Sequence, residues 1–160
     1  MQKVTIICTG KLKEKFYLDA AAEYAKRLSR FCTLTILELP EERLPESPSP
    51  AQIEAALARE ADAVRAKLPA GCLLIAMCVE GQERSSEALA RYLAEAAAWG
   101  AGHIVFLIGS SYGMHPSLKQ QADLRLSMSP MTFPHHLLRV MLLEQIYRAY
   151  QINAGSKYHK

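Results

Sequence analysis

The hydrophobic positions of the chain fall into two kinds of segment. Five short segments are β-branched or apolar along most of their length, and the third of them carries no charge at all. Such runs predict strands, and continuous apolarity predicts strands that are buried on both faces of a sheet. The expected strands cover residues 3–8, 33–39, 72–79, 103–108 and 124–128, the third of them ending at Glu80-Gly81.

Between these runs, apolar residues recur at steps of three and four, which is the spacing of one helix face. Pro50 suits the first turn of a helix, where its missing N–H costs nothing, and Ser85 or Ser86 is suited to capping another helix. Helices are expected over residues 14–31, from Pro50 to Leu68, from Ser85 or Ser86 to Trp99, over 116–122 and over 135–151.

Alternation of buried strands with helices predicts an α/β fold, with a mostly parallel sheet and helices on both faces. The length of 160 residues suits one domain, so residues 1–160 are expected to fold as a single unit. Ligands of such sheets bind at the carboxyl ends of the strands. The segments expected at that edge are Met77–Gly81, Gly109–Gly113 and Met128–Pro134.

Composition narrows the class of protein. Half of the residues are apolar and 22% are charged, which is ordinary for a globular domain and excludes a disordered or collagen-like chain. No run reaches the ~20 apolar residues that a membrane span needs. The four cysteines form no C-x-x-C pair and no zinc-ligand spacing with histidine. Free thiols, no metal and a reducing, cytoplasmic location are therefore expected.

The net charge of +3 is small, but its distribution is uneven. From Pro130 to Lys160 the only acidic residue is Glu144, whereas the same stretch holds four Lys or Arg residues and three histidines. A basic carboxyl-terminal end suits a polyanionic partner. A solvated tail accounts for the same charges equally well.

The sharpest local feature is Gly109-Ser110-Ser111-Tyr112-Gly113, which follows an apolar strand. It matches the G-x-S-x-G nucleophile elbow of hydrolases, with Ser111 as nucleophile and Asp123 and a histidine further along the chain. No oxyanion-hole loop precedes it, and no Gly-Lys-Ser/Thr follows that would make it a phosphate-binding P-loop. The other interpretation is a glycine loop that lets a ligand approach the backbone.

Two further features lie near the end of the chain. The segment from Ser127 to His136 holds Pro130 and Pro134, so it is expected to be a stiff extended loop whose backbone groups can recognise a flat polar ligand such as a purine edge. The alternative is a simple connection into the last helix. That helix is apolar nearly all round, which favours a subunit interface. Its arginines must be paired or face phosphate.

Six motifs together resemble one family. They are Gly10-Lys11-Leu12-Lys13-Glu14-Lys15, Glu80-Gly81 with Ser85-Ser86-Glu87, Ile108-Gly109 with Gly113, Met131-Thr132-Phe133-Pro134-His135, Glu144-Gln145-Ile146-Tyr147-Arg148-Ala149 and Tyr158-His159-Lys160. In this order the chain resembles, over its whole length, the RlmH family of bacterial 23S ribosomal RNA pseudouridine N3-methyltransferases of the SPOUT class.

The resemblance implies an enzyme that depends on S-adenosylmethionine, with an α/β knot fold whose carboxyl-terminal part forms a deep trefoil knot. It also implies a homodimer with the cofactor near the subunit interface, and as substrate a pseudouridine of 23S rRNA in the assembled ribosome. The residues implied to hold the cofactor, largely through backbone groups, are Met77, Gly109, Met128, Ser129, Pro130, Met131, Thr132 and Phe133.

Transfer of a methyl group to a ring nitrogen requires positioning of the two reactants and removal of an imide proton. His135 is the candidate base, because an unperturbed histidine pKa lies near 6.5. The candidate RNA contacts are Arg139, Arg148, Lys157, Tyr158, His159 and Lys160, with Tyr158 able to stack on a base. A serine hydrolase that uses Ser111 and a non-catalytic RNA-binding module are the alternative functions.

One position departs from the family pattern. The family usually has a second glycine where this chain has Ser110. A serine there is strained if the backbone requires a positive φ, and otherwise its hydroxyl adds a hydrogen bond.

Overall fold

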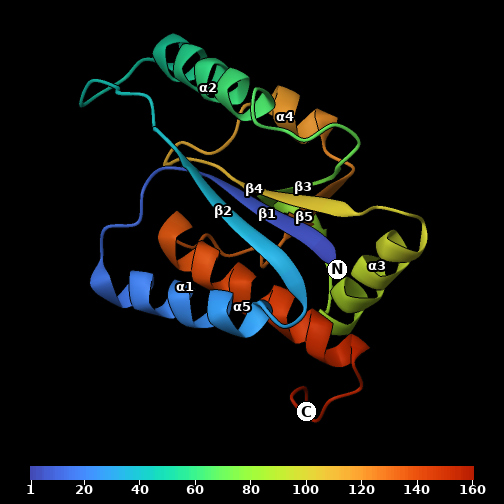
Figure 1. Ribbon diagram of the computed structural model, residues 1–160. Helices are drawn as coiled ribbons and strands as arrows, with labels where there is room; N and C mark the ends of the chain where they lie inside the picture. The colour runs from blue at the N-terminus through green and yellow to red at the C-terminus, as the bar shows by residue number, and fades with distance from the viewer.

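The computed structural model describes residues 1–160 and is built on a five-stranded sheet (Figure 1). The strand order is β2-β1-β4-β3-β5, and every neighbouring pair is parallel. The predicted fold class is confirmed. The strands are β1 (Gln2–Thr9), β2 (Cys32–Leu39), β3 (Leu73–Glu83), β4 (His103–Ile108) and β5 (Leu124–Ser127).

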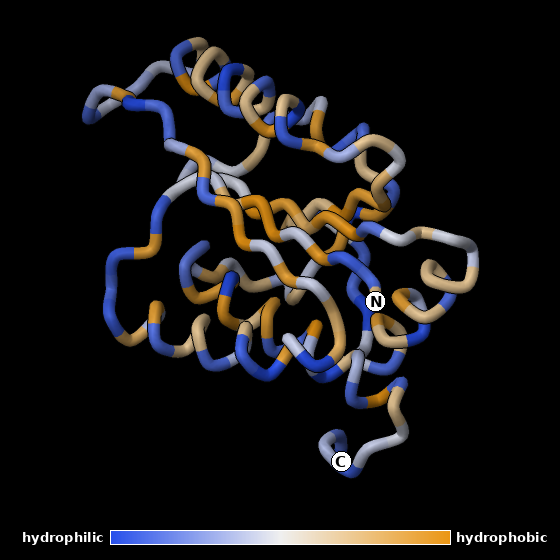
Figure 2. Tube along the Cα trace, viewed as in Figure 1, coloured by the Kyte–Doolittle hydropathy of each residue, from blue (hydrophilic) through white to orange (hydrophobic).

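Helices cover both faces of this sheet, as the ribbon shows (Figure 1). One face carries three helices, α1 (Lys15–Leu28), α3 (Ser86–Ala98) and α5 (His135–Asn153). The other face carries α2 (Pro50–Arg65) and α4 (Pro116–Gln121). The trace in Figure 2 is most hydrophobic along the central strands, and no helix is long and apolar enough to cross a membrane.

Successive side chains of each strand point to opposite faces of the sheet, and this alternation creates two hydrophobic cores. In β4, Ile104 and Phe106 pack under α1, α3 and α5, whereas Val105 and Leu107 pack under α2 and α4. All four are at most 1% exposed. Successive side chains of a strand point to opposite faces, so a run that is apolar at every position is what a sheet covered on both faces requires.

The helix starts follow the predicted capping chemistry. The Ser49 hydroxyl accepts the Gln52 N–H, and the Gln52 side chain in turn accepts the Ser49 N–H, in a capping box directly before Pro50. Of the two serines considered for α3, Ser85 is the cap, since it accepts the Ala88 N–H. Two helices end earlier than their apolar stripes indicated. Helix α1 stops at Leu28, leaving Phe31 to stack on Tyr150, and α2 stops at Arg65.

The predicted end of the third strand is wrong. β3 does not stop at Glu80-Gly81 but continues to Glu83, paired with β5 on both sides of a register shift between Met77 and Gln82. A Cβ on Gly81 would lie 2.8 Å from the Arg125 backbone, so only glycine allows this approach. Backbone pairing, which hydropathy does not report, sustains the polar half of the strand.

The last helix packs one side into the core between α1 and α3. Its buried positions are Arg139, Leu142, Leu143, Ile146 and Ala149. The remaining positions from His135 to Ile152 are only partly buried by the chain itself. The trefoil knot expected for this end of the chain stays a prediction.

Candidate functional site

A cavity of about 580 Å³ lies at the carboxyl ends of β4 and β5 and beside residues 77–80 of β3. This is the edge at which an α/β sheet is expected to bind its ligand, and the volume falls in the range of small-molecule sites. Seven of the eight predicted cofactor residues line it, namely Met77, Gly109, Met128, Ser129, Met131, Thr132 and Phe133; Pro130 does not. His135 also lines this cavity, which we call the apolar cavity because half of its lining residues are hydrophobic.

The wall of the apolar cavity after β4 is a tight turn formed by residues 109–113. Ser110 and Gly113 exchange backbone hydrogen bonds of 3.0 and 2.9 Å. A Cβ on Gly109 would lie 2.7 Å from the Gly113 carbonyl carbon, so the close approach itself requires glycine at 109. Gly113 has a φ of 92°, which also favours glycine.

The departure at Ser110 is free of backbone strain, because no residue other than glycine has a positive φ. The buried Ser110 hydroxyl donates to the Glu60 carboxylate of α2 at 2.8 Å. Of the two consequences considered for this serine, the structure shows the added hydrogen bond. Burial raises the pKa of Glu60, against the lowering effect of the hydrogen bonds from the Glu42 N–H and the Ser110 hydroxyl.

The opposite wall is the extended loop after β5. Its Ser127 and Ser129 side chains satisfy nearby backbone groups, at 3.0 Å for the contact between the Ser129 hydroxyl and the Met131 N–H. The backbone N–H groups of Met128, Thr132 and Phe133 have no acceptor within the chain. A cavity with hydrophobic walls and unused backbone donors fits a purine-bearing cofactor such as S-adenosylmethionine, which has both apolar surface and ring acceptors.

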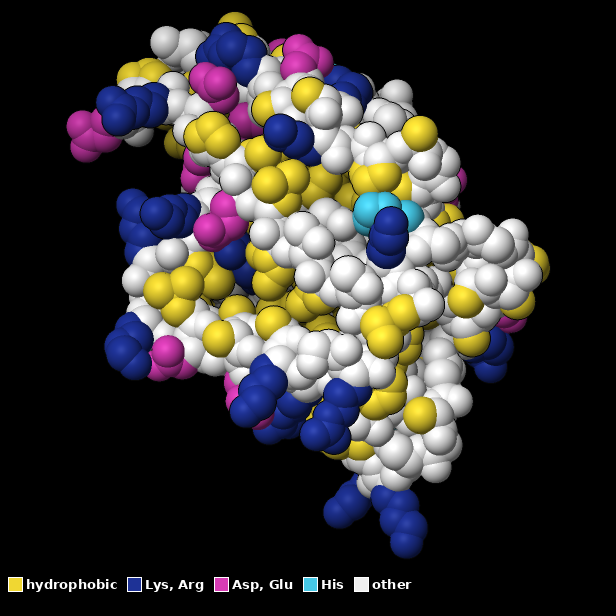
Figure 3. Space-filling model, in the orientation of Figure 1, with side chains coloured by type: hydrophobic (Ala, Val, Ile, Leu, Met, Phe, Trp, Pro, Cys, Tyr) yellow, Lys and Arg dark blue, Asp and Glu magenta, His cyan; other side chains and the backbone are white.

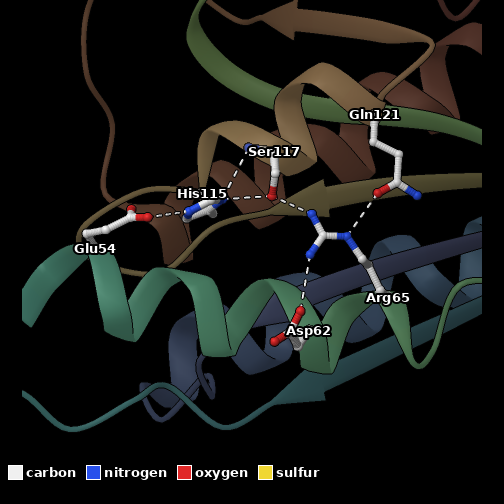
Figure 4. Close-up of polar contacts among 6 residues, drawn as sticks. All are labelled: Glu54, Asp62, Arg65, His115, Ser117 and Gln121. Atoms are coloured by element: carbon white, nitrogen blue, oxygen red, sulfur yellow. Dashed lines mark hydrogen bonds and ion pairs between the residues drawn. The ribbon is translucent and has the colours of Figure 1, made fainter.

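Helix α4 contributes Lys119 to the lining of the apolar cavity, and side chains of α2 bond to this helix (Figure 4). His115 accepts the Ser117 N–H and contacts Glu54 at 2.9 Å, while Arg65 bonds to Ser117, Gln121 and Asp62. Lys119 of α4 pairs with Glu80 in the second half of β3. The Lys119–Glu80 pair therefore joins α4 to β3, and both residues line the apolar cavity.

A second cavity of about 560 Å³ adjoins the first, at the carboxyl ends of β1 and β2. Only one of its ten lining residues is hydrophobic, and we call it the charged cavity. Its lining comprises Gly10, Lys11, Lys13, Glu38, Leu39, Pro40, Glu41, Ser111, His135 and His136. Sequence reasoning did not predict this site, although the motif from Gly10 to Lys13 directly after a strand was the available signal.

His135 lies where the two cavities meet, at the start of α5. Burial lowers the pKa of His135, and the neighbouring His136 and Arg139 lower it further, against Glu41 and Glu14. The ring is therefore neutral near pH 7 and able to accept a proton. It makes no hydrogen bond within the chain; its ring centroid lies 4.2 Å from that of His136.

Ser111 has no catalytic triad around it. Its hydroxyl donates to Glu41 at 2.7 Å, and its backbone N–H donates to the same oxygen at 3.0 Å. Asp123 accepts the Leu74 N–H instead of orienting a histidine. The hydrolase interpretation is wrong, because a serine nucleophile needs a histidine within hydrogen-bond reach to take its proton.

Arg139 is not placed to contact RNA, which corrects its predicted role. It is 3% exposed and pairs with Glu38 at 2.7 Å, while it also donates to the Gly10 carbonyl at 3.2 Å. Burial by itself raises the pKa of Glu38, but the hydrogen bonds from Arg139 and from the Leu12 N–H lower it overall. The pair is structural, and it fixes the ends of β1 and β2 to α5.

The other predicted RNA residues form a cluster where the tail folds back on α5. Arg148 pairs with Glu144 at 2.7 Å and lies 4.8 Å from the Tyr158 ring centroid. Tyr158 donates to Glu144 as well, and His159 contacts Glu87 of α3 at 2.7 Å. Lys157 and Lys160 are exposed. Contact of this cluster with RNA stays a prediction.

Comparison with known proteins agrees with this geometry. A family model described as a predicted SPOUT methyltransferase matches residues 2–159. A Haemophilus influenzae Rd KW20 structure described as a probable methylase family protein superposes over 99% of this chain and 71% of its own, with a TM-score of 0.57 and 12% identity, which shows the fold alone. The chain therefore belongs to the SPOUT methyltransferases.

Its relatives define the family more narrowly. Ribosomal RNA large subunit methyltransferase H of Bifidobacterium adolescentis is 46% identical over 158 residues, 99% of each chain. The protein of the same name from Levilactobacillus brevis is 43% identical over 98% of this chain and 99% of the relative. Within the SPOUT class, the chain is thus a member of the ribosomal RNA large subunit methyltransferase H family.

Proposed function

We propose that the protein transfers a methyl group from S-adenosylmethionine to N3 of a pseudouridine in 23S rRNA of the assembled ribosome. The observation that carries the proposal is the apolar cavity, whose predicted residues and unused backbone N–H groups meet at one sheet edge. Family membership and the names of the relatives support the substrate class. A ribosomal substrate also supports a cytoplasmic location.

In this proposal the loop from Met128 to Phe133 holds the cofactor through its backbone, and Met77 and Phe133 shield it from water. S-adenosylmethionine, when bound, supplies a methyl group on a positively charged sulfur. His135 takes the proton from N3 of the substrate, so that the nitrogen lone pair is free to form the new N–CH₃ bond. Positioning of the two reactants supplies much of the rate, and no covalent enzyme intermediate is required.

Two measurements test the function. Isothermal titration with S-adenosylmethionine should show one saturable site per chain. Incubation with ribosomes from cells that lack this modification should give one methylated pseudouridine in digested 23S rRNA, detected by mass spectrometry. Binding to ribosomes without any affinity for the cofactor would instead indicate a non-catalytic RNA-binding module.

We further propose that the protein is a homodimer. Leu137, Val140 and Met141 of α5 are apolar and only partly buried by the chain itself, which supports a second copy packed on this helix. A mass from light scattering equal to one chain at micromolar concentration would contradict the dimer. The tail residues Arg148, Lys157, Tyr158, His159 and Lys160 are proposed to contact RNA, and truncation after Ala154 tests this through the salt dependence of ribosome binding.

A further inference from the structure

The charged cavity is built by a loop that the core holds in place. Leu12 is 4% exposed and its N–H donates to Glu38 at 2.8 Å. The Gly10 N–H donates to the Leu39 carbonyl at 2.8 Å, and the Gly10 carbonyl accepts from Arg139. The backbone on either side of Lys11 is therefore anchored to β2 and α5, and the loop needs little ordering when a ligand binds.

The two lysines of this loop are exposed, and neither is within ion-pair distance of a carboxylate. Lys11 and Lys13 flank the buried Leu12, and neither takes part in an ion pair, whereas the nearby Lys15 pairs with Asp19 at 2.7 Å. Figure 3 shows Lys and Arg side chains gathered on the left of the view, where the β1–α1 connection lies in Figure 1. Two unpaired ammonium groups on an anchored loop suit phosphate groups.

The far wall of the charged cavity offers groups for a base. Ser111 binds only one oxygen of Glu41, so Glu41 Oε2 has no donor within the chain and remains an acceptor for a ring N–H. His135 and Ser111 line both cavities, so a ligand in the charged cavity reaches the boundary of the apolar one. A methyl acceptor must enter from a space that adjoins the donor site, because the two reacting atoms have to meet.

We infer that the charged cavity receives the target nucleotide of the RNA, with Lys11 and Lys13 bound to its flanking phosphates and Glu41 and His135 facing the base. The inference rests on the proposed function, and it assigns the acceptor site to the first two strands of the sheet, away from the basic tail. An enzyme that modifies a base needs that base unstacked, and a cavity of this volume accommodates one extruded nucleotide.

The test compares the double variant Lys11→Ala/Lys13→Ala with the wild type, with Lys15→Ala as a control that removes one charge from the same surface. Methyl transfer is measured on ribosomes from cells that lack the modification, at several salt concentrations. We expect the double variant to raise the KM for ribosomes at least about tenfold. The slope of log KM against log salt concentration, called the salt slope, should fall by about two, one for each lost phosphate contact. Lys15→Ala should keep both values, and Lys11→Arg/Lys13→Arg should restore them.

Titration with S-adenosylhomocysteine separates the outcomes. The inference predicts that the double variant binds this product as the wild type does, with an unchanged urea midpoint. An unchanged KM and salt slope in the double variant overturns the inference while the proposed function stands. A parallel loss of product binding also overturns it, because the lysines would then serve the cofactor. A wild-type protein that transfers no methyl group to ribosomes overturns the proposed function and this inference together.

Discussion

The two adjoining cavities at the carboxyl edge of the sheet are built in opposite ways. The apolar cavity is lined by the middle of β3 and by the loops after β4 and β5, half of its lining residues are hydrophobic, and it offers unused backbone N–H donors. The charged cavity is lined by the ends of β1 and β2, and it offers lysines, carboxylates and histidines. Backbone donors and small residues suit a ligand that is enclosed, whereas long charged side chains suit one that extends into a larger partner.

The boundary between the cavities follows from the strand order. β1 and β4 are neighbours in the sheet, with Cys8 paired to Ile108, but the chain leaves β1 toward β2 and leaves β4 toward β5. Their connections therefore diverge and leave a crevice at this edge, as is general for α/β sheets. Ser111 and His135 lie in that crevice and belong to both cavities.

The largest effect is expected from His135, which joins the two cavities. His135→Ala should lower kcat for methyl transfer by about 10²-fold or more, the usual contribution of a general base. Because burial lowers the pKa of His135, the wild-type rate should fall only as the pH drops below the ordinary histidine value of about 6.5. The pH profile of single-turnover transfer to ribosomes measures both effects.

His103→Asn is the matched control for this prediction, since His103 begins β4 at the opposite end of the strand and bonds to Thr5. It should retain the wild-type rate. A wild-type rate in His135→Ala at saturating ribosome would remove His135 from the mechanism and leave the crevice without a proton acceptor.

Gly109→Ala should damage the apolar cavity, which Gly109 lines, more than the charged cavity, which it does not. The new Cβ would lie 2.7 Å from the Gly113 carbonyl carbon, so the turn after β4 must move. We expect affinity for S-adenosylmethionine to fall about 100-fold, roughly 3 kcal/mol, as measured by isothermal titration. Gly102→Ala, where a Cβ meets nothing within 4 Å, should bind normally. Equal binding by both variants would show that the turn does not shape the cofactor site.

Arg139→Ala should loosen the charged cavity. Removing one partner of a buried ion pair is costly, but Glu38 keeps a side-chain exposure of 34% and regains some hydration. We expect a loss of roughly 2 kcal/mol in the free energy of unfolding, measured by urea titration. Since Arg139 also holds the Gly10 carbonyl, the KM for ribosomes should rise more than the Kd for the cofactor. A larger rise in the Kd for the cofactor than in the KM for ribosomes would contradict the assignment of RNA to the charged cavity and cofactor to the apolar cavity.

The smallest effect concerns Glu60 behind the turn. Its pKa is raised in the folded protein, so the folded state binds the proton more tightly than the unfolded state does. Stability from this group is therefore present at low pH and is lost as the pH rises from the ordinary carboxyl value through the raised one. The wild type should therefore lose stability relative to Glu60→Gln across that window, as measured by urea unfolding at several pH values. A difference in the free energy of unfolding between the two proteins that stays constant with pH would exclude this contribution.

Sequence reasoning located the apolar cavity because its residues follow directly after apolar runs. Met77 lies near the end of one such run and Gly109 directly follows another, and the loop after β5 is recognisable by its two prolines. The charged cavity was missed because Lys11, Lys13 and Glu41 are ordinary surface residues in a linear pattern. Arg139 was misassigned for a related reason: its partner Glu38 lies 101 positions away, and hydropathy does not pair residues across that distance.

The chain by itself determined the alternation of strands and helices, the two-sided burial of the sheet and the loop chemistry at its carboxyl edge. These follow from local periodicity and from the restricted backbone of glycine and proline. The tertiary structure alone decided the strand order, the continuation of β3 past Gly81, the burial of Arg139 and the meeting of two unlike cavities at His135. Such features depend on which distant segments pack together, and that choice is made by the summed burial of the whole core rather than by any one stretch of sequence.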